Sequence, residues 1–191
     1  MKNISPIILV LLIAISCKKY PTTIKNETAL KVFEIDSNTV RKHLYTLASD
    51  EMEGRGTGTP GIEKAAVYIE NEFERIGLAT FQDLETYRQT FTFENRRTQE
   101  KITASNIIGV LEGKSKKDEF VVVSAHFDHL GIRKTTGQLD SIYNGANDDA
   151  SGVTGVLTLA EYFKNKGTNE RTIVFVAFTG EEMGLKGSTH F

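Results

Sequence analysis

Apolar residues recur with helical spacing in three segments of the chain. In residues 36–47 they fall three to four positions apart, and Ser37 is placed to cap this helix at its start. Residues 62–76 form a clear amphipathic pattern, which Gly77 is placed to end. A third helical pattern covers residues 153–160. The sequence therefore predicts three helices, separated by segments of a different kind.

The segments between and after these helices have the apolar patterns of β-strands. Residues 87–93 alternate along one face, and residues 104–111 are an apolar run rich in β-branched side chains. Residues 120–125 and 172–178 are nearly continuous apolar runs, as in strands covered on both faces. A strand, a helix and a strand in this order imply a right-handed βαβ crossover. The predicted fold class is α/β, with a mainly parallel sheet flanked by helices.

The composition fits one globular domain with an ordinary surface. The chain has 191 residues, of which 39% are hydrophobic and 25% charged, and its net charge is -2. Lys and Arg are scattered among acidic residues without a basic block, which argues against a nucleic-acid partner. Residues 18–35 are polar and lack periodicity, so we interpret them as a tether to a folded part, residues 36–191.

The first 17 residues have the features of an export signal. Lys2 supplies a short positive region, residues 7–15 are apolar, and a small residue stands directly before Cys17, the only cysteine of the sequence. This arrangement resembles the lipobox of bacterial lipoproteins, in which the cysteine is lipidated. The alternative is an ordinary secretory signal with an incidental cysteine. Both interpretations predict an exported protein, either anchored to a membrane through Cys17, in the periplasm or at the cell surface, or secreted.

Acidic residues and histidines gather in three short clusters, at residues 126–128, 147–152 and 180–188. Each cluster follows an apolar run or opens a helical one. Open parallel sheets bind ligands beyond the carboxyl ends of their strands, so the clusters are expected to meet at one edge of the sheet. This arrangement suggests a metal-dependent hydrolase.

The first cluster offers a histidine with an acidic neighbour. His126 and Asp128 lie two positions apart at a strand end, so their side chains are expected on the same face. A metal-binding imidazole usually donates its second N–H to a carboxylate, and Asp128 is placed for that role. Taken alone, the pair also fits a histidine that only satisfies its hydrogen bonds at a strand end. His129 is expected on the opposite face, in the pocket wall or supporting a ligand.

Two pairs of adjacent carboxylates complete the candidate chemistry. Asp148 and Asp149 precede a helix, so one of them is expected to cap it while the other binds a cation. Adjacent residues cannot present their side chains alike, so Glu181 and Glu182 are expected to divide the roles of metal ligand and general base. The alternatives are a capping pair at the first position and a solvated acidic loop at the second.

Residues 125–131, 144–152 and 180–188 resemble motifs of the co-catalytic zinc aminopeptidase family. Residues 47–61 also resemble bacterial members, and residues 36–191 match the N-terminal part of the peptidase domain in order and spacing. The family includes secreted bacterial leucyl aminopeptidases, vacuolar aminopeptidase Y, glutamate carboxypeptidase and glutaminyl cyclase. The resemblance implies a zinc-exopeptidase fold of the phosphorylase/hydrolase-like type, with peptides as substrates and two zinc ions as cofactors.

The resemblance also implies a role for each candidate residue. His126 matches a ligand of one zinc ion, and Asp148 matches the carboxylate that bridges both ions. Glu182 matches a ligand of the second zinc ion. The two expected catalytic residues are Glu181, which matches the general base, and Asp128, which matches the acid that orients the histidine.

The family uses two further ligands, an acidic residue and a histidine, which come well after the Glu-Glu pair. His190 is too close to that pair in sequence to serve, so the chain as given is expected to be C-terminally truncated and, alone, to have little activity. The reaction that the resemblance implies is release of an N-terminal residue from a peptide. The alternatives are a glutaminyl-peptide cyclotransferase with a single zinc ion, and an inactive, truncated lipoprotein that keeps the fold for binding.

Overall fold

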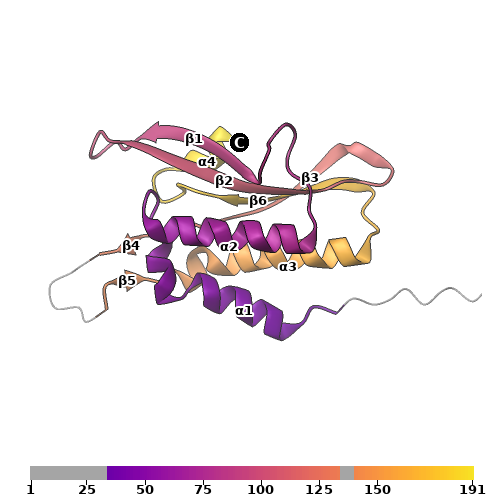
Figure 1. The fold of residues 1–191 in the computed structure, drawn as a ribbon, viewed down its shortest axis with the longest axis horizontal. Coiled ribbons are helices and arrows are strands. Elements are labelled where there is room, and N and C mark those ends of the chain that lie inside the picture. The colour runs from indigo at the N-terminus through magenta and orange to yellow at the C-terminus, as the bar shows by residue number, and fades with distance from the viewer. Residues whose placement is uncertain (1–33, 134–139) are drawn as a thin grey trace, which may run out of the picture. The chain divides into compact units, whose positions relative to one another are not determined.

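The computed structural model describes residues 34–133 and 140–191 (Figure 1). The predicted export signal, Cys17 and all but the last two residues of the predicted tether lie outside the described residues. In the described part of the chain, no helix is both long enough and apolar enough to cross a membrane.

The described chain begins with two helices, continues with five strands, and ends with a helix, a strand and a short helix. The helices are α1 (Ser37–Leu47), α2 (Pro60–Ile76), α3 (Ser151–Lys166) and α4 (Lys186–His190), with short helical turns η1 (Asp50–Arg55) and η2 (Ala146–Ala150). The strands are β1 (Arg88–Glu94), β2 (Lys101–Leu111), β3 (Lys116–His126), β4 (Gly131–Ile132), β5 (Ile142–Tyr143) and β6 (Arg171–Phe178). All three predicted helices and all four predicted strands are therefore present.

The start of α1 differs by one residue from the expectation, because Asp36 and not Ser37 is the cap. Asp36 has an extended backbone, and its carboxylate accepts hydrogen bonds from the amides of Asn38 and Thr39, at 3.1 Å each. A carboxylate at this position satisfies amide groups that have no partner inside the helix. At the end of α2, Gly77 has the left-handed conformation (φ 78°) expected of a terminating glycine.

The main sheet is mixed. Its strand order is β1-β2-β6-β3; β3 pairs with β6 in parallel, while β2 pairs with β1 and with β6 in antiparallel fashion. The α/β class with flanking helices is confirmed, and the predicted crossover corresponds to β3, α3 and β6. Parallel pairing among the described strands is limited to this one pair, whereas the sequence suggested a mainly parallel sheet. Strands β4 and β5 form a separate small ribbon.

The helices α1, α2 and α3 lie on one face of the sheet, and the short α4 lies on the other (Figure 1). The larger apolar core fills the space between the three helices and the sheet, with Phe73, Leu157 and Phe175 fully buried. A smaller cluster on the opposite face contains Ile108 and Val176. Burial on both faces explains the continuous apolar run of β6.

Strand β3 differs from the expectation of cover on both faces. Phe120, Val121 and Val122 are 61%, 44% and 49% exposed. The reason is positional, because β3 is an edge strand of the sheet that the described residues form. The carboxyl end of the same strand is covered by α3 and η2, and this end carries the candidate site.

Candidate metal centre

Three chain segments meet at the carboxyl end of the parallel strand pair. Strand β3 ends at His126, and the loop after β6 carries Glu181 and Glu182. The turn η2, directly before α3, carries Asp148. The three clusters predicted to meet at one sheet edge do so, because two parallel neighbours and the helix between them bring their ends together.

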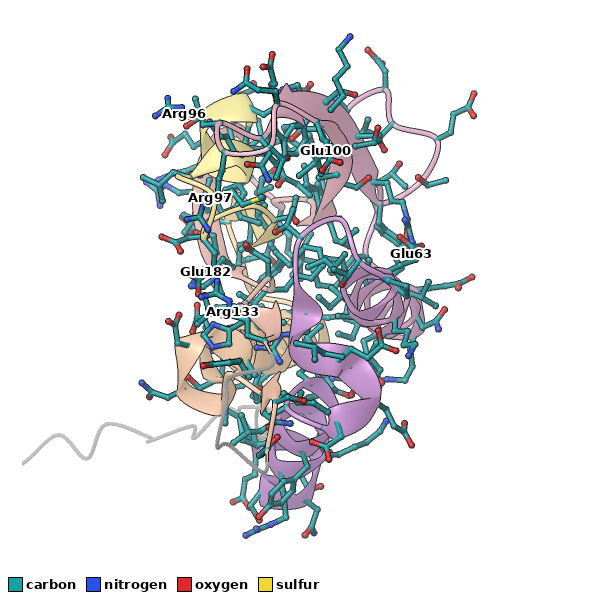
Figure 2. All side chains as sticks on the ribbon, turned by 90° about the vertical axis from the view of Figure 1, so that its left-hand side faces the viewer. Glu63, Arg96, Arg97, Glu100, Arg133 and Glu182 are labelled. Atoms are coloured by element: carbon teal, nitrogen blue, oxygen red, sulfur yellow. The ribbon has the colours of Figure 1, made fainter. Side chains whose placement is uncertain are left out.

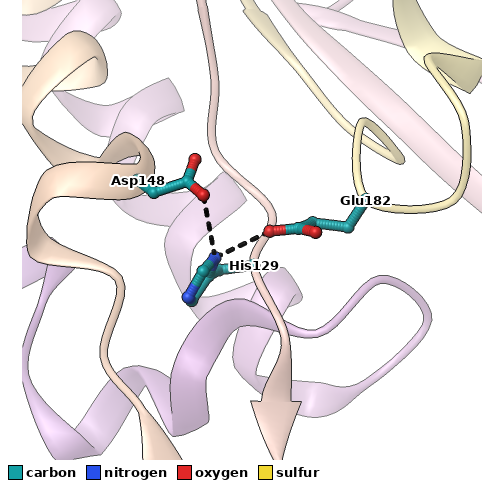
Figure 3. Close-up of side chains that lie close together, drawn as sticks. All are labelled: His129, Asp148 and Glu182. Carbon is teal, nitrogen blue, oxygen red and sulfur yellow. Dashed lines mark hydrogen bonds and ion pairs between the residues drawn. The ribbon is translucent and has the colours of Figure 1, made fainter.

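One group of potential ligands consists of His129, Asp148 and Glu182 (Figure 3). Nδ1 of His129 lies 2.8 Å from Oε1 of Glu182 and 4.0 Å from Oδ2 of Asp148. One ligand atom from each residue lies within 4.8 Å of the other two. Sequence reasoning placed Asp148 and Glu182 here, and it expected His129 in the wall of the pocket or in support of a ligand.

His126 lies on the other side of Asp148. Its Nε2 is 3.0 Å from Oδ1 of Asp148, so this carboxylate presents one oxygen to His126 and the other to His129. Nδ1 of His126 lies 3.1 Å from the backbone oxygen of Asp128. Burial lowers the pKa of His126, but the nearby negative carboxylate of Asp128 and the hydrogen bond to the Asp128 backbone oxygen outweigh burial and raise this pKa to about 9.

Asp128 is fully buried, and its carboxylate fixes the loop that carries the two glutamates. Its oxygens accept hydrogen bonds from the amides of Glu181 (3.1 Å) and Glu182 (3.2 Å) and from Oγ1 of Thr57 (2.9 Å). Its Oδ1 is 3.7 Å from Nδ1 of His126, which is beyond hydrogen-bonding distance. The carboxylate therefore contacts the glutamate backbone directly, while the backbone carbonyl of Asp128 contacts the histidine ring.

The two aspartates of η2 differ in their contacts. Oδ1 of Asp149 accepts a hydrogen bond from the amide of Gly152 (2.9 Å), and its Oδ2 accepts one from the amide of His126 (3.4 Å). Asp149 thus accepts from an amide in the first turn of α3 and ties the start of this helix to the end of β3. Asp148 makes no such backbone contact among the described hydrogen bonds, and its side chain is 60% exposed. It is therefore available as a ligand.

Arg55 is a supporting residue that sequence reasoning missed. It is fully buried, and its guanidinium donates to the backbone oxygens of Leu47, of Phe127 (2.8 Å), of Asn144 (2.6 Å) and of Gly145 (2.9 Å). Burial lowers its pKa, and the charges of nearby aspartates oppose this shift. Arg55 therefore connects three segments: the end of α1 at Leu47, the residue after His126, and the residues before Asp148. The sequence signal that could have pointed to this role was a lone arginine between two glycines in a loop that was expected to be ordered.

Gly145 is required where the chain approaches Asp148. Its φ is +58°, and a Cβ at this position would lie 2.6 Å from Cδ2 of His129 and 2.7 Å from Nη2 of Arg55. Both the positive φ and the close approach exclude a side chain without a local shift. The position of η2 against His129 therefore depends on this glycine.

Replacing Gly145 with Ala is expected to lower the unfolding free energy by about 1–3 kcal/mol and to weaken zinc binding. Thermal or denaturant unfolding and zinc titration measure the two effects. Gly155→Ala is the matched control, because Gly155 lies in α3 and an added Cβ there meets nothing within 4 Å. It is expected to leave zinc binding unchanged and to stabilise the helix slightly. Equal behaviour of the two variants would contradict the role of Gly145.

The donor set fits zinc. Imidazole nitrogens and carboxylate oxygens are common zinc ligands, and bonds of about 2.0–2.2 Å in a tetrahedron separate two ligands by roughly 3.3–3.6 Å. The 3.0 Å between His126 and Asp148, and the spread of at most 4.8 Å among His129, Asp148 and Glu182, are on this scale. Glu181 is partly exposed beside the group, with its backbone held by Asp128.

Comparison with known protein sequences identifies relatives of the chain. Residues 106–191 match Peptidase family M28. The alkaline phosphatase isozyme conversion protein of Escherichia coli strain K12 is 32% identical over 159 residues, which cover 80% of this chain and 44% of that protein. A probable zinc metalloprotease of Pyricularia oryzae is 40% identical over 87 residues (46% of this chain, 17% of the relative). Aminopeptidase YwaD of Bacillus subtilis strain 168 is 36% identical over 90 residues (47% and 17%).

Solved structures share the fold. Glutaminyl cyclase of Fimbriiglobus ruber superimposes with a TM-score of 0.65 at 25% identity, covering 80% of this chain and 48% of that one. A zinc-dependent exopeptidase of Parabacteroides distasonis has a TM-score of 0.60 at 20% identity, covering 78% and 48%. The chain spans less than half the length of each of these proteins. Zinc is the metal that these relatives imply, and residues 106–191 of the chain are similar to Peptidase family M28.

Proposed function

We propose that the protein is a zinc aminopeptidase, in which two metal ions share the carboxylate of Asp148. The observation that carries this proposal is the position of Asp148, with one oxygen 3.0 Å from His126 and a ligand atom within 4.8 Å of one from Glu182. A carboxylate between two groups of donors is suited to bridge two ions. The name of the relative aminopeptidase YwaD supports peptide N-termini as the substrate class.

His126 and Asp148 would hold one ion, and Asp148 and Glu182 the other. His129 would orient Glu182 through the 2.8 Å contact between Nδ1 and Oε1. The family resemblance implies one further acidic ligand and one further histidine. When bound, zinc supplies a Lewis acid that polarises the scissile carbonyl and makes water more acidic.

Glu181 would act as the general base. Its carboxylate takes a proton from the water that attacks the peptide carbonyl, and it returns this proton to the leaving amine as the C–N bond breaks. Asp128 supports this role, because its Oδ1 accepts the amide hydrogen of Glu181 and so fixes the residue in the loop after β6. The free amine of the substrate binds near the carboxylates, which restricts cleavage to the first residue.

Glutaminyl cyclisation is the second candidate reaction. It is favoured by the likeness to glutaminyl cyclase of Fimbriiglobus ruber, with a TM-score of 0.65 at 25% identity. In this reaction the α-amine of an N-terminal glutamine would attack its own side-chain amide, which gives a pyroglutamyl peptide and releases ammonia without hydrolysis. The product of the reaction therefore separates the two candidates.

The complete gene product, loaded with zinc, is expected to release free leucine from a leucyl peptide. Chelation of the metal should remove at least about 99% of the rate, and added zinc should restore it. Mass spectrometry of leucyl and glutaminyl peptides measures both candidate reactions in one assay. Pyroglutamyl peptide as the only product would replace aminopeptidase with cyclase activity. A chelator-resistant rate would contradict a metal-dependent mechanism.

A further inference from the structure

A cavity of about 530 Å³ opens beside the candidate metal centre. His129 and Glu182 belong to its lining, so it is continuous with one side of the ligand group. The turn between β1 and β2 lines a second side, and the segment around β4 lines a third. Ligand sites commonly have volumes of about 300–1,000 Å³, so the cavity has room for one or two peptide residues.

The lining of this cavity is predominantly cationic. Four basic side chains line it, against the two carboxylates of Glu94 and Glu182: Arg96, Arg97, Arg133 and Lys186. Figure 2 shows Glu182 in one column with the arginines, with Arg97 on one side and Arg133 on the other. Binding of Glu182 to zinc would offset its own negative charge. The positive charge therefore lies around the part of the cavity next to Glu182, where the portion of a substrate that extends away from the metal centre would bind.

The turn that carries Arg96 and Arg97 is held by its own hydrogen bonds. Oδ1 of Asn95 accepts from the amide of Arg97 (2.9 Å), and Nε2 of Gln99 donates to the backbone oxygen of Arg96 (3.0 Å). The amide of Gln99 also donates to the backbone oxygen of Asn95 (2.8 Å). These bonds fix the backbone from which the two arginines extend into the cavity lining.

The other two cations are held by aromatic rings. The guanidinium of Arg133 lies 5.8 Å from the ring centre of Tyr143, and Nζ of Lys186 lies 5.8 Å from that of Phe93. Contacts of this kind restrain a cation without using its N–H groups as a carboxylate would. The N–H groups therefore stay available for an anion.

None of the four cations forms an ion pair within 4.0 Å in the part of the chain that the structure describes. Arg88 provides the contrast on the same strand pair, because it pairs with Glu63 at 2.7 Å and with Glu70 at 2.6 Å. Acidic residues are abundant in this sequence, with 25 Asp and Glu. A group of unpaired cations in a cavity is therefore a distinct feature of this surface.

We propose that the cavity binds a carboxylate of the substrate close to the scissile bond, so that the protein prefers anionic peptides. The proposal rests on the proposed function for the peptide nature of the ligand. The carboxylate can belong to an acidic side chain or to the C-terminus of a short peptide, and both suit the planar guanidinium groups of Arg96, Arg97 and Arg133.

The test is a binding measurement that needs no turnover. Zinc-loaded Glu181→Gln protein, prepared from the complete gene product, is titrated by calorimetry with three peptides: Leu-Ala-Ala-amide, Leu-Asp-Ala-amide and Leu-Ala-Ala with a free C-terminus. At least one of the two peptides with a carboxylate is expected to bind about five- to tenfold more tightly than the neutral amide. The tighter of the two identifies the source of the carboxylate. Added salt should reduce the difference, because it screens exposed charges.

The triple variant R96Q/R97Q/R133Q should abolish the preference, so that the three peptides bind with similar affinity. The control R41Q/K117Q/K166Q removes the same charge at exposed positions outside the cavity lining and should retain the preference. Equal or undetectable binding of all three peptides by the Glu181→Gln protein would overturn the proposal, as would a preference that survives in the triple variant. The proposed function is tested separately by leucine release from the neutral amide by the wild-type protein, so the two can fail independently.

Discussion

Replacement of Glu181 by Gln is expected to lower kcat for leucyl peptides by about 10²–10⁴-fold, while the zinc content stays unchanged. Gln has nearly the same shape as Glu but cannot accept the proton of the attacking water. The contact that fixes this residue involves its backbone amide and Oδ1 of Asp128 (3.1 Å), so the substitution leaves it intact. Loss of rate without loss of metal is the signature of a base that is not a ligand.

Two variants make this measurement selective. His126→Ala should lose both zinc and activity, because it removes an imidazole 3.0 Å from Asp148. Glu74→Gln makes the same chemical change at an exposed position on α2 and should leave both unchanged. Metal content by atomic spectroscopy and steady-state rates on the same preparations give the comparison. Near wild-type turnover in Glu181→Gln would assign the base to another group.

The features that could be predicted from the sequence are those with local signals. The helices and strands follow from the period of apolar residues, and the meeting of the three clusters follows from strand ends. The alternation rule placed His129 on the face opposite to Asp128, but it gave no reason to expect His129 beside Glu182. Strand β3 ends at His126, and the buried Phe127 leads out of it. Beyond a strand end the period of two no longer applies, so His129 can face Glu182.

Sheet pairing and Arg55 depend on partners that are distant in the sequence. The antiparallel pairing of β2 with β6 joins residues 107–111 to residues 173–177, and no local pattern distinguishes it from parallel pairing. Arg55 contacts backbone oxygens of residues 8 to 90 positions away. Carbonyl groups occur in every residue, so the sequence contains no signal for these partners. The contribution of Arg55 is therefore known from the structure alone.

Replacement of Arg55 by Met is expected to lower the unfolding free energy by about 3–5 kcal/mol. Met keeps much of the side-chain volume, but it leaves the backbone oxygens of Leu47, Phe127, Asn144 and Gly145 without their donor in a buried place. Denaturant unfolding of the metal-free protein measures this loss. Arg41→Met is the matched control, because Arg41 is exposed on α1 and, among the described residues, its polar and cation–π contacts are with Tyr45. Its effect should stay within about 0.5 kcal/mol.

Arg55→Lys separates the role of Arg55 in the site from its role in stability. Lys keeps the positive charge near Asp128, Asp148 and Asp149, but one ammonium group cannot reach the carbonyls that the planar guanidinium joins. We expect a smaller loss of stability than in Arg55→Met, together with zinc binding at least about tenfold weaker in protein that is still folded. Weaker zinc binding in a folded variant follows only if Arg55 sets the relative positions of His126 and Asp148. Full zinc affinity in folded Arg55→Lys would limit Arg55 to the stability of the fold, because the ligands would then keep their places without the guanidinium.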